Sequence, residues 1–294
     1  MPDPIRSIGF IGLGVMGEAM CRNLAERGDW PVVAHDLDPA PVARLAAAGA
    51  KPAASLDDAL AADLVVTCLP GGDQVRALML GEGGVAARLR PGQAYVDMST
   101  SPPALMREIA EAAPEGAFTA DAPVARTRTA AAEGKLLIMV GGPAESFEHI
   151  RPVMETMGSD VVHCGPAGAG QVAKILNNMV LFETVAALAE AVEMGERSGI
   201  EADALLDVLS LGSANSFALG AHGRKSLAPQ DYPERAFSVR YAAKDLSYAQ
   251  AIAAETGVRA PGAEHVAELF EEAEASGRGD LYFPVIREVL KNGR

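Results

Sequence analysis

The sequence predicts an α/β domain with a doubly wound, mostly parallel sheet, followed by an all-helical domain. From residue 7 to 164, short apolar β-prone segments alternate with segments whose apolar residues recur at helical spacing. From residue 165 onward helical patterns follow one another and no strand pattern occurs. The glycine-rich residues 165–170 join the two parts. We therefore expect domains at 1–164 and 165–294.

Each strand expected in the first domain is a short apolar run bounded by turn residues. Each expected helix starts near a Gly or Pro turn and carries apolar residues three or four apart. A kink is expected near Pro152, inside the last of these helices. The expected strands cover 7–11, 31–36, 63–70, 94–99, 117–124, 136–142 and 160–165, and the expected helices cover 12–28, 39–49, a stretch from 73, 102–113 and 143–158.

The second domain opens on a long apolar stretch at 172–198. A helix of ~30 residues is ~45 Å long. Apolar residues lie on most sides of this one, which favours burial between domains or between subunits. We also expect a homodimer or homotetramer. Further helices are expected at 202–210, 239–256 and 263–275.

Charge and cysteine content limit the possible partners. The 294-residue chain carries a formal net charge of -14, which argues against nucleic acid and against anionic membranes. Holding an anionic ligand would need a local positive charge. The scattered thiols of Cys21, Cys68 and Cys164 form no metal-binding pattern and fit a reducing cytoplasm. The sequence shows neither a signal peptide nor a spanning segment, so we expect a cytoplasmic protein without a metal site.

A glycine-rich loop follows the first expected strand and opens the first helix. Gly12 permits a tight turn, Gly14 lets a pyrophosphate approach the backbone, and Gly17 allows close packing of helix on strand. Asp36, at the end of the second strand, can accept from both ribose hydroxyls and repels a 2′-phosphate, which favours NAD. A loop without a ligand, or an Asp36 that only caps a turn, is the alternative. The intervening Leu13, Val15 and Met16 are expected to contact the cofactor.

Two further strands end in residues suited to the same crevice. Leu69 and Pro70 end one strand, and Ser99 and Thr100 end the next. The carboxyl ends of parallel strands face the cofactor in this kind of sheet. We expect Leu69, Pro70 and Thr100 to contact the cofactor and Ser99 to contact the substrate. Each would otherwise be an ordinary turn residue.

Five segments together resemble the β-hydroxyacid dehydrogenase family, which includes 3-hydroxyisobutyrate dehydrogenases and tartronate semialdehyde reductases. They are "GFIGLGVMG", "DMSTS", "DAPV…EGKLLIMVGG", "GPAGAGQVAKILNN" and "AAKDL", in this order along nearly the whole chain. The resemblance implies a Rossmann domain that binds NAD, a long connecting helix and an all-α domain of the 6-phosphogluconate-dehydrogenase-like type.

The resemblance also implies that Lys174 is catalytic. Its ammonium can protonate a carbonyl oxygen during reduction, and its neutral amine can accept the proton during oxidation. Asn178 lies one turn further on the same helix face, and with Asn177 it is expected to bind the substrate. Lys244 matches a family lysine that reaches the cofactor. Each lysine would otherwise be a solvated surface residue.

The segment "DAPVARTRT" departs from the common family pattern, in which Ser-Gly-Gly follows "DAPV". Here Arg126 and Thr127 stand in place of the glycines. This looks like the branch that reduces 3-sulfolactaldehyde, where an arginine holds the sulfonate. A guanidinium suits an oxyanion because it donates in a fixed fork. We expect Arg126 and Thr127 to bind an anionic substrate, and a solvent-facing arginine is the alternative, more so for Arg128.

Three classes of function remain open. The expected one is NAD-dependent interconversion of a small anionic 3-hydroxy acid and its semialdehyde, with 3-sulfolactaldehyde reduction as a named alternative. A non-catalytic NAD-binding protein would be expected to lack Lys174. A decarboxylating enzyme like 6-phosphogluconate dehydrogenase would need a longer chain and a second basic cluster for a phosphate.

Overall fold

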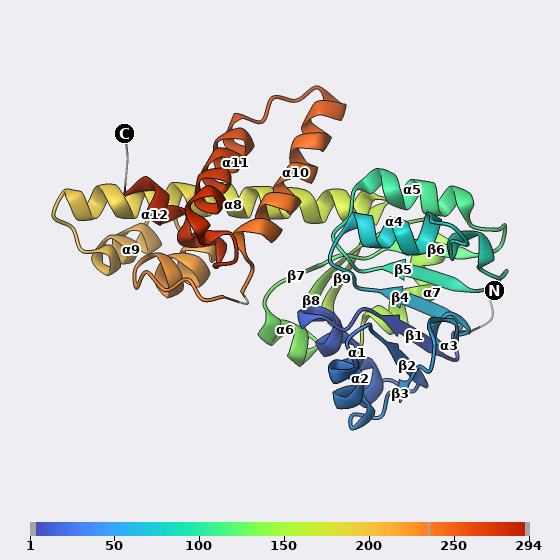
Figure 1. The fold of residues 1–294 in the computed structure, drawn as a ribbon. Coiled ribbons are helices and arrows are strands. Elements are labelled where there is room, and N and C mark those ends of the chain that lie inside the picture. The colour runs from blue at the N-terminus through green and yellow to red at the C-terminus, as the bar shows by residue number, and fades with distance from the viewer. Residues whose placement is uncertain (1–3, 235, 292–294) are drawn as a thin grey trace. The chain divides into compact units, whose positions relative to one another are not determined.

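The computed structural model describes residues 4–234 and 236–291, so residues 1–3, 235 and 292–294 lie outside it, including the outer ends of both predicted domains. The chain forms two compact units, Met1–Lys174 and Ile175–Arg294. Unit 1 is an α/β domain with one β-sheet and unit 2 is helical, which confirms the predicted fold class (Figure 1).

The sheet of unit 1 is parallel except around one strand. Its order is β3-β2-β1-β4-β5-β6-β8-β7, with β9 beside β8, and β8 runs antiparallel to β6 and β7. The first and fourth strands in the chain are neighbours, which is the arrangement of a doubly wound sheet. The strands are β1 (Ile8–Ile11), β2 (Val32–His35), β3 (Lys51–Pro52), β4 (Leu64–Thr67), β5 (Ala94–Asp97), β6 (Phe118–Asp121), β7 (Val124–Ala125), β8 (Leu136–Gly141) and β9 (Gly158–Gly165).

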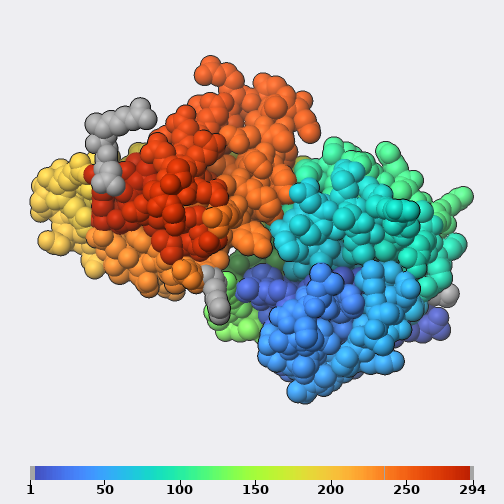
Figure 2. Space-filling model, viewed as in Figure 1, coloured from blue at the N-terminus to red at the C-terminus, as the bar shows by residue number. Residues whose placement is uncertain are grey.

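Successive residues of the central strands point to opposite faces of the sheet. In β4, for example, Leu64 and Val66 enter one apolar core while Val65 enters the other. Both faces are therefore buried, which explains why these strands are apolar throughout. Helices α4 and α5 lie together over one face, and α1 and α2 lie over the other (Figure 1). In Figure 2 the atoms of this part of the chain, cyan to green, form a continuous surface.

The helices of unit 1 match the expected pattern, with short additions. The additions are α3, the 3₁₀ turn η1 and α6, which are too short to give a clear apolar period. Their bounds are α1 (Val15–Arg27), α2 (Pro39–Ala46), α3 (Leu56–Leu60), α4 (Gly72–Leu80), η1 (Ala86–Arg88), α5 (Pro103–Ala112), α6 (Arg128–Glu133) and α7 (Ala144–Met154).

Several expected strands end earlier in the structure. The strand predicted to reach Pro70 ends at Thr67, and the one predicted to reach Ser99 ends at Asp97. The single strand expected at 117–124 is two strands, β6 and β7, separated by a segment that contains Pro123. Proline has no N–H to donate to a neighbouring strand, so the hydrogen-bond ladder is interrupted there.

Unit 2 is built around the second part of a long helix, α8 (Ala169–Arg197), which starts in unit 1. Phe182 is fully buried there and contacts the rings of Phe237, Phe270 and Phe283. The other elements are α9 (Ala202–Leu211), the π-helical segments η2 (Leu219–Leu227) and η3 (Glu274–Arg278), α10 (Val239–Thr256), α11 (Pro261–Ala273), the 3₁₀ turn η4 (Phe283–Val285) and α12 (Ile286–Leu290).

Helix α8 is long and apolar enough to cross a membrane by length and composition alone. A core helix meets the same two criteria. Phe182, Val185 and Ala189 of α8 are fully buried in the apolar core of unit 2, which accounts for much of its apolar character.

Candidate functional site

The glycine-rich loop between β1 and α1 has the geometry that its sequence predicts. Gly12 has φ +94°, and a Cβ there would lie 2.3 Å from the Cys68 carbonyl oxygen. A Cβ on Gly17 would lie 2.0 Å from the Gly12 oxygen, so helix and loop pack too closely for a side chain. A Cβ on Gly14 would meet no atom within 4 Å. Open space at Gly14, at the N-terminal end of α1, fits the approach of a pyrophosphate.

Asp36 lies beside this loop, immediately after β2. One carboxylate oxygen accepts the N–H of Leu13 at 2.5 Å, and the other accepts the N–H of Asp38 at 2.8 Å. These bonds orient the carboxylate beside the glycine-rich turn. The next residue, Leu37, is 97 % exposed.

The three residues between the glycines are placed differently from one another. The Leu13 side chain is buried in the core, so only its backbone is available to a ligand. Met16 packs partly against the same core. Val15 is exposed at the start of α1. Of the three side chains, Val15 is therefore the most accessible to a bound molecule.

The loops after β4 and β5 are joined by a hydrogen bond. The Leu69 N–H donates to Ser99 Oγ at 2.8 Å, and Ser99 is buried. Asp97, at the end of β5, accepts from Thr67 Oγ1, the Ser99 N–H and Ser101 Oγ. Burial raises the pKa of the Asp97 carboxyl. The Ser99 hydroxyl thus already holds the neighbouring loop, and Pro70 and Thr100 follow Leu69 and Ser99 in the same two loops.

The start of α8 is bonded to the same edge of the sheet. Asp121, at the end of β6, accepts the N–H groups of Gly168 at 2.7 Å and Gln171 at 2.7 Å. The Gln171 side chain donates to the Ser99 carbonyl oxygen at 2.8 Å and accepts the Ser101 N–H at 3.0 Å. Burial raises the pKa of Asp121 to about 6.

Glycines make this close approach possible. A Cβ on Gly141 would lie 2.5 Å from a carboxylate oxygen of Asp121, and one on Gly170 would lie 2.2 Å from the Met139 carbonyl oxygen. Lys174 lies three residues after Gln171 on the same helix. The helical turn that carries Lys174 is thereby held at the carboxyl edge of the parallel strands.

Further along α8, the paired asparagines belong to a polar network. Asn177 Nδ2 donates to Asn178 Oδ1 at 3.2 Å, and Asn178 Nδ2 donates to Asp245 Oδ2 at 2.7 Å. Asp245 is buried, and Lys244 Nζ lies 3.0 Å from its Oδ1. Asp245 therefore links three predicted site residues: Asn177, Asn178 and Lys244.

Arg126 lies at the end of the short strand β7. Its φ of +89° is a left-handed backbone conformation that a non-glycine residue rarely adopts. This is the position at which the common family pattern has glycine. The structure thus keeps a glycine-like backbone while adding a guanidinium to the surface of unit 1.

Thr127 is the N-cap of α6, a helix that the sequence analysis missed. Its Oγ1 accepts the N–H of Ala130 at 3.2 Å. Gly134 ends the helix at φ 69°. Arg128 is the first residue of the helix. The segment after Arg126 is therefore an ordered helical turn.

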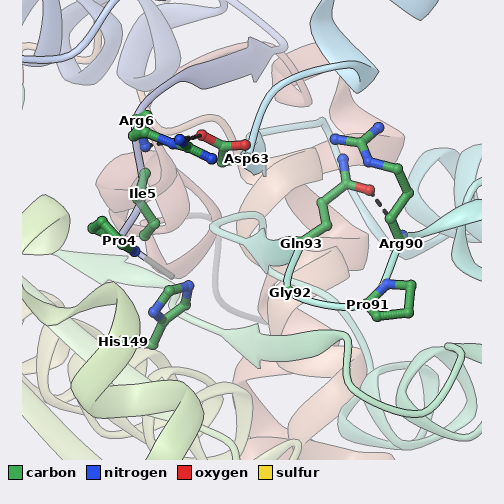
Figure 3. Close-up of a pocket in the computed structure, with 9 residues that line it drawn as sticks. All are labelled: Pro4, Ile5, Arg6, Asp63, Arg90, Pro91, Gly92, Gln93 and His149. Carbon is green, nitrogen blue, oxygen red and sulfur yellow. Dashed lines mark hydrogen bonds and ion pairs between the residues drawn. The ribbon is translucent and has the colours of Figure 1, made fainter. Parts of the chain in front are cut away.

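A separate pocket lies at the opposite, amino-terminal edge of the sheet (Figure 3). Its lining includes Asp63 and Gln93, which directly precede β4 and β5. The Arg6 side chain lies beside Asp63, and the Arg90 N–H bonds to Gln93. None of the residues predicted for the site lines this pocket, so it is not the candidate site.

The site residues predicted from the sequence do not include Asp97, Asp121, Gln171 or Asp245. Each lies inside one of the five family-like segments, and each is a buried polar residue. For Asp97 and Asp121 the available signal was an aspartate at the end of an apolar strand, because buried carboxylates need specific donors. Within residues 4–234 and 236–291, no group of three or more His, Cys, Asp or Glu side chains is arranged to hold a metal ion.

Two family models match the chain. The NAD binding domain of 6-phosphogluconate dehydrogenase matches residues 7–165. The domain described as NAD-binding of NADP-dependent 3-hydroxyisobutyrate dehydrogenase matches residues 168–287. Together they account for both units and support NAD as the cofactor that the glycine-rich loop and Asp36 fit.

Individual proteins resemble the chain over its whole length. An NAD-dependent L-serine dehydrogenase of Pseudomonas aeruginosa is 36 % identical, covering 97 % of this chain and 98 % of its own. A 3-hydroxyisobutyrate dehydrogenase of the same organism is 38 % identical with the same coverage. The solved structure of Mycobacterium tuberculosis 3-hydroxyisobutyrate dehydrogenase with L-serine is 35 % identical with a TM-score of 0.87, covering 98 % of this chain and 99 % of the other.

Proposed function

This chain belongs to the β-hydroxyacid dehydrogenase family and is an NAD-dependent hydroxyacid dehydrogenase, and we propose that it interconverts a small anionic 3-hydroxy acid and its semialdehyde. The observation that carries this proposal is the anchoring of the α8 start, with Lys174, to the strand ends beside Ser99 and Asp121. The glycine-rich loop and Asp36 lie at the same edge.

The cofactor supplies hydride exchange at a carbon atom when it is bound. In the proposal, the Gly12–Gly17 loop and the N-terminal N–H groups of α1 bind its pyrophosphate. Asp36 accepts from the ribose hydroxyls of the adenosine half. Residues of the next two loops and of α10 complete the cofactor contacts: Leu69, Pro70, Thr100 and Lys244, together with Leu13, Val15 and Met16 of the first loop.

Lys174 is proposed to move the proton. In the reduction direction its ammonium gives a proton to the aldehyde oxygen as the carbon receives hydride, and oxidation reverses both transfers. Asn178 is proposed to hold the reacting oxygen, and Asn177 and Ser99 to bind the rest of the substrate. The hydrogen bond from Asn178 to Asp245 supports this assignment because it fixes the amide orientation.

Arg126 and Thr127 are proposed to bind the anionic group of the substrate. A guanidinium offers several donors in one plane, which suits a carboxylate or a sulfonate. Two of the named relatives support a small acid in general, since one is an L-serine dehydrogenase and another a 3-hydroxyisobutyrate dehydrogenase. Arg126 at a glycine-like position is the observation that favours 3-sulfolactaldehyde as the second candidate.

Replacing Arg126 by alanine should selectively impair anionic substrates. A charge-assisted hydrogen bond contributes ~1.5–3 kcal/mol, so KM should rise roughly ten- to a hundredfold. The measurement is the initial rate of NADH oxidation with 3-sulfolactaldehyde and with the semialdehyde of 3-hydroxyisobutyrate, against neutral glyceraldehyde. The KM for glyceraldehyde and the affinity for NADH should stay unchanged.

Two further variants separate the effect of the guanidinium from the effect of the backbone conformation. Arg126→Gly also removes the charge but relieves the left-handed φ, so it should lose anion selectivity while gaining about 1 kcal/mol of stability. Arg126→Lys should restore anion binding only in part, because an ammonium cannot donate in a fork. If all three variants treat charged and neutral aldehydes as the wild type does, Arg126 does not bind the substrate.

Replacing Asp36 by alanine should narrow the preference for NADH over NADPH. The carboxylate that accepts from the ribose and repels a 2′-phosphate would be gone. The measurement is the ratio of kcat/KM for the two cofactors with one aldehyde. Asp38→Ala, which removes the neighbouring N-cap carboxylate of α2, is the matched control and should leave the ratio unchanged. An unaltered ratio in Asp36→Ala would mean that selectivity lies elsewhere.

The remaining expectations concern catalysis, location in the cell and oligomeric state. The relatives are named as dehydrogenases, which favours catalysis over a non-catalytic NAD-binding role. We further propose that the protein acts in the cytoplasm as a homodimer or homotetramer. Its unpaired cysteines support the first part, and size-exclusion chromatography with light scattering tests the second.

A further inference from the structure

The Arg126 guanidinium is bound by the residue before β8 and by the start of β9. Its Nη1 donates to the Lys135 carbonyl oxygen at 2.8 Å and to Ser159 Oγ at 2.7 Å. Its Nη2 lies 2.6 Å from Asp160 Oδ2. Ser159 Oγ also lies 2.9 Å from the same Asp160 oxygen, so the two residues form one continuous acceptor surface.

These contacts leave one edge of the guanidinium available. Three of its five N–H groups are engaged, whereas the Nε–H and the second Nη2–H have no acceptor among the residues that the structure describes. Nε and Nη2 form an edge that can donate two parallel hydrogen bonds to one oxyanion. The bound edge and the available edge belong to the same rigid plane, so fixing one orients the other.

The Arg126–Asp160 pair is too exposed to matter much for folding. The two side chains are 40 % and 50 % exposed, and such pairs contribute little to stability. The hydrogen bond from Ser159 and the charge of Arg126 lower the pKa of the Asp160 carboxyl, so it is ionised at neutral pH. Its effect is therefore to orient Arg126.

We propose that Asp160, supported by Ser159, is a positioning residue that turns the Nε and Nη2 edge of Arg126 toward the anionic group of the substrate. This inference rests on the proposed role of Arg126. Asp160 itself does not touch the substrate. Its negative charge also opposes a bound anion, so the hydrogen bond favours substrate binding while the charge disfavours it.

Two substitutions separate these opposing effects. Asp160→Ala removes the acceptor and frees the guanidinium, which must then be ordered by the substrate. Because the substrate must then order one long side chain, we expect the KM to be roughly two- to tenfold higher for 3-sulfolactaldehyde and for the semialdehyde of 3-hydroxyisobutyrate. Asp160→Asn keeps an oxygen acceptor for Nη2 but removes the charge. Its KM should equal that of the wild type or fall on the order of twofold.

Two readouts and one control variant distinguish a change in the orientation of Arg126 from a general loss of structure. The KM for glyceraldehyde and the kcat for the anionic aldehydes should stay within about twofold in both variants, since neither proton transfer nor cofactor binding changes. Asp57→Ala is the matched control, because Asp57 is also an exposed carboxylate paired with an arginine, Arg88, at 2.9 Å. It should leave every KM unchanged.

Two outcomes would overturn the proposal. One is a KM for the anionic aldehydes that is unchanged or lower in Asp160→Ala. The other is a KM in Asp160→Asn that rises as far as in Asp160→Ala. If Arg126→Ala raises the KM for the anionic aldehydes but not for glyceraldehyde, while the Asp160 variants behave like the wild type, only the positioning role fails. If Arg126→Ala has no selective effect, the proposed role of Arg126 fails as well.

Discussion

Lys174→Ala is expected to lower the single-turnover rate of aldehyde reduction by ~10²–10⁴-fold while NADH still binds. The residue lies on the α8 turn that Asp121 and Gln171 hold at the carboxyl edge of the sheet. Loss of its amine removes the group proposed to protonate the aldehyde oxygen. The rate is measured by stopped-flow NADH absorbance, and NADH affinity by fluorescence titration of the same variant.

Lys174→Arg provides the control for charge. An arginine keeps the positive charge but holds its proton at neutral pH, so it is a poor general acid or base. We expect NADH affinity close to that of the wild type and a rate nearly as low as in the alanine variant. A wild-type rate in either variant would refute the role of Lys174 in proton transfer.

Arg287→Ala is expected to destabilise unit 2 by about 3–5 kcal/mol. The Arg287 side chain is 0 % exposed and joins α12 to α8. It bonds to Glu196 and to the Leu227 carbonyl oxygen, and its Nε lies 3.5 Å from Glu193 Oε2. Its removal leaves a cavity and takes away the guanidinium that pairs with Glu196, while Glu193 keeps its pair with Arg197.

Urea denaturation can assign this loss to the correct unit. Trp30, the single tryptophan, lies in unit 1, so its fluorescence follows that unit, whereas far-UV circular dichroism also follows the helices of unit 2. The dichroism midpoint should fall more than the fluorescence midpoint. Arg197→Ala is the control, because Arg197 pairs with the same Glu193 but is exposed, and it should cost less than about 1 kcal/mol. Equal losses in the two variants would contradict the account.

Local spacing predicted the geometry of the glycine-rich turn, which is local in the sequence. Gly12, Gly14, Gly17 and Asp36 belong to one strand–turn–helix–strand unit, so their proposed roles follow from their order in the sequence. The long helix and the three helices α9, α10 and α11 were predicted for the same reason, since an apolar period is a property of one segment. The helical segments η2 and α12 were not predicted. The structure confirms the fold class that these patterns indicated.

The contacts that hold the site together could not be predicted in this way. Asp121 bonds to Gln171 across 50 residues, and Asn178 bonds to Asp245 across 67 residues. Such pairs arise from the tertiary fold, and no local pattern specifies them. The strand at 136–142 was predicted, but its antiparallel direction as β8 was not. The left-handed φ of Arg126 was also not predicted, because arginine has no preference for that conformation.

The most direct test of the central claim is the kcat/KM of the wild-type protein for aldehydes of different charge, with NADH as reductant. The substrates are 3-sulfolactaldehyde, tartronate semialdehyde and the semialdehyde of 3-hydroxyisobutyrate, with neutral glyceraldehyde for comparison. We predict that at least one anionic aldehyde exceeds glyceraldehyde by roughly tenfold or more, as one charge-assisted hydrogen bond to the anion requires. Equal or higher kcat/KM for glyceraldehyde, or no turnover of any of the three anionic aldehydes, would contradict the account.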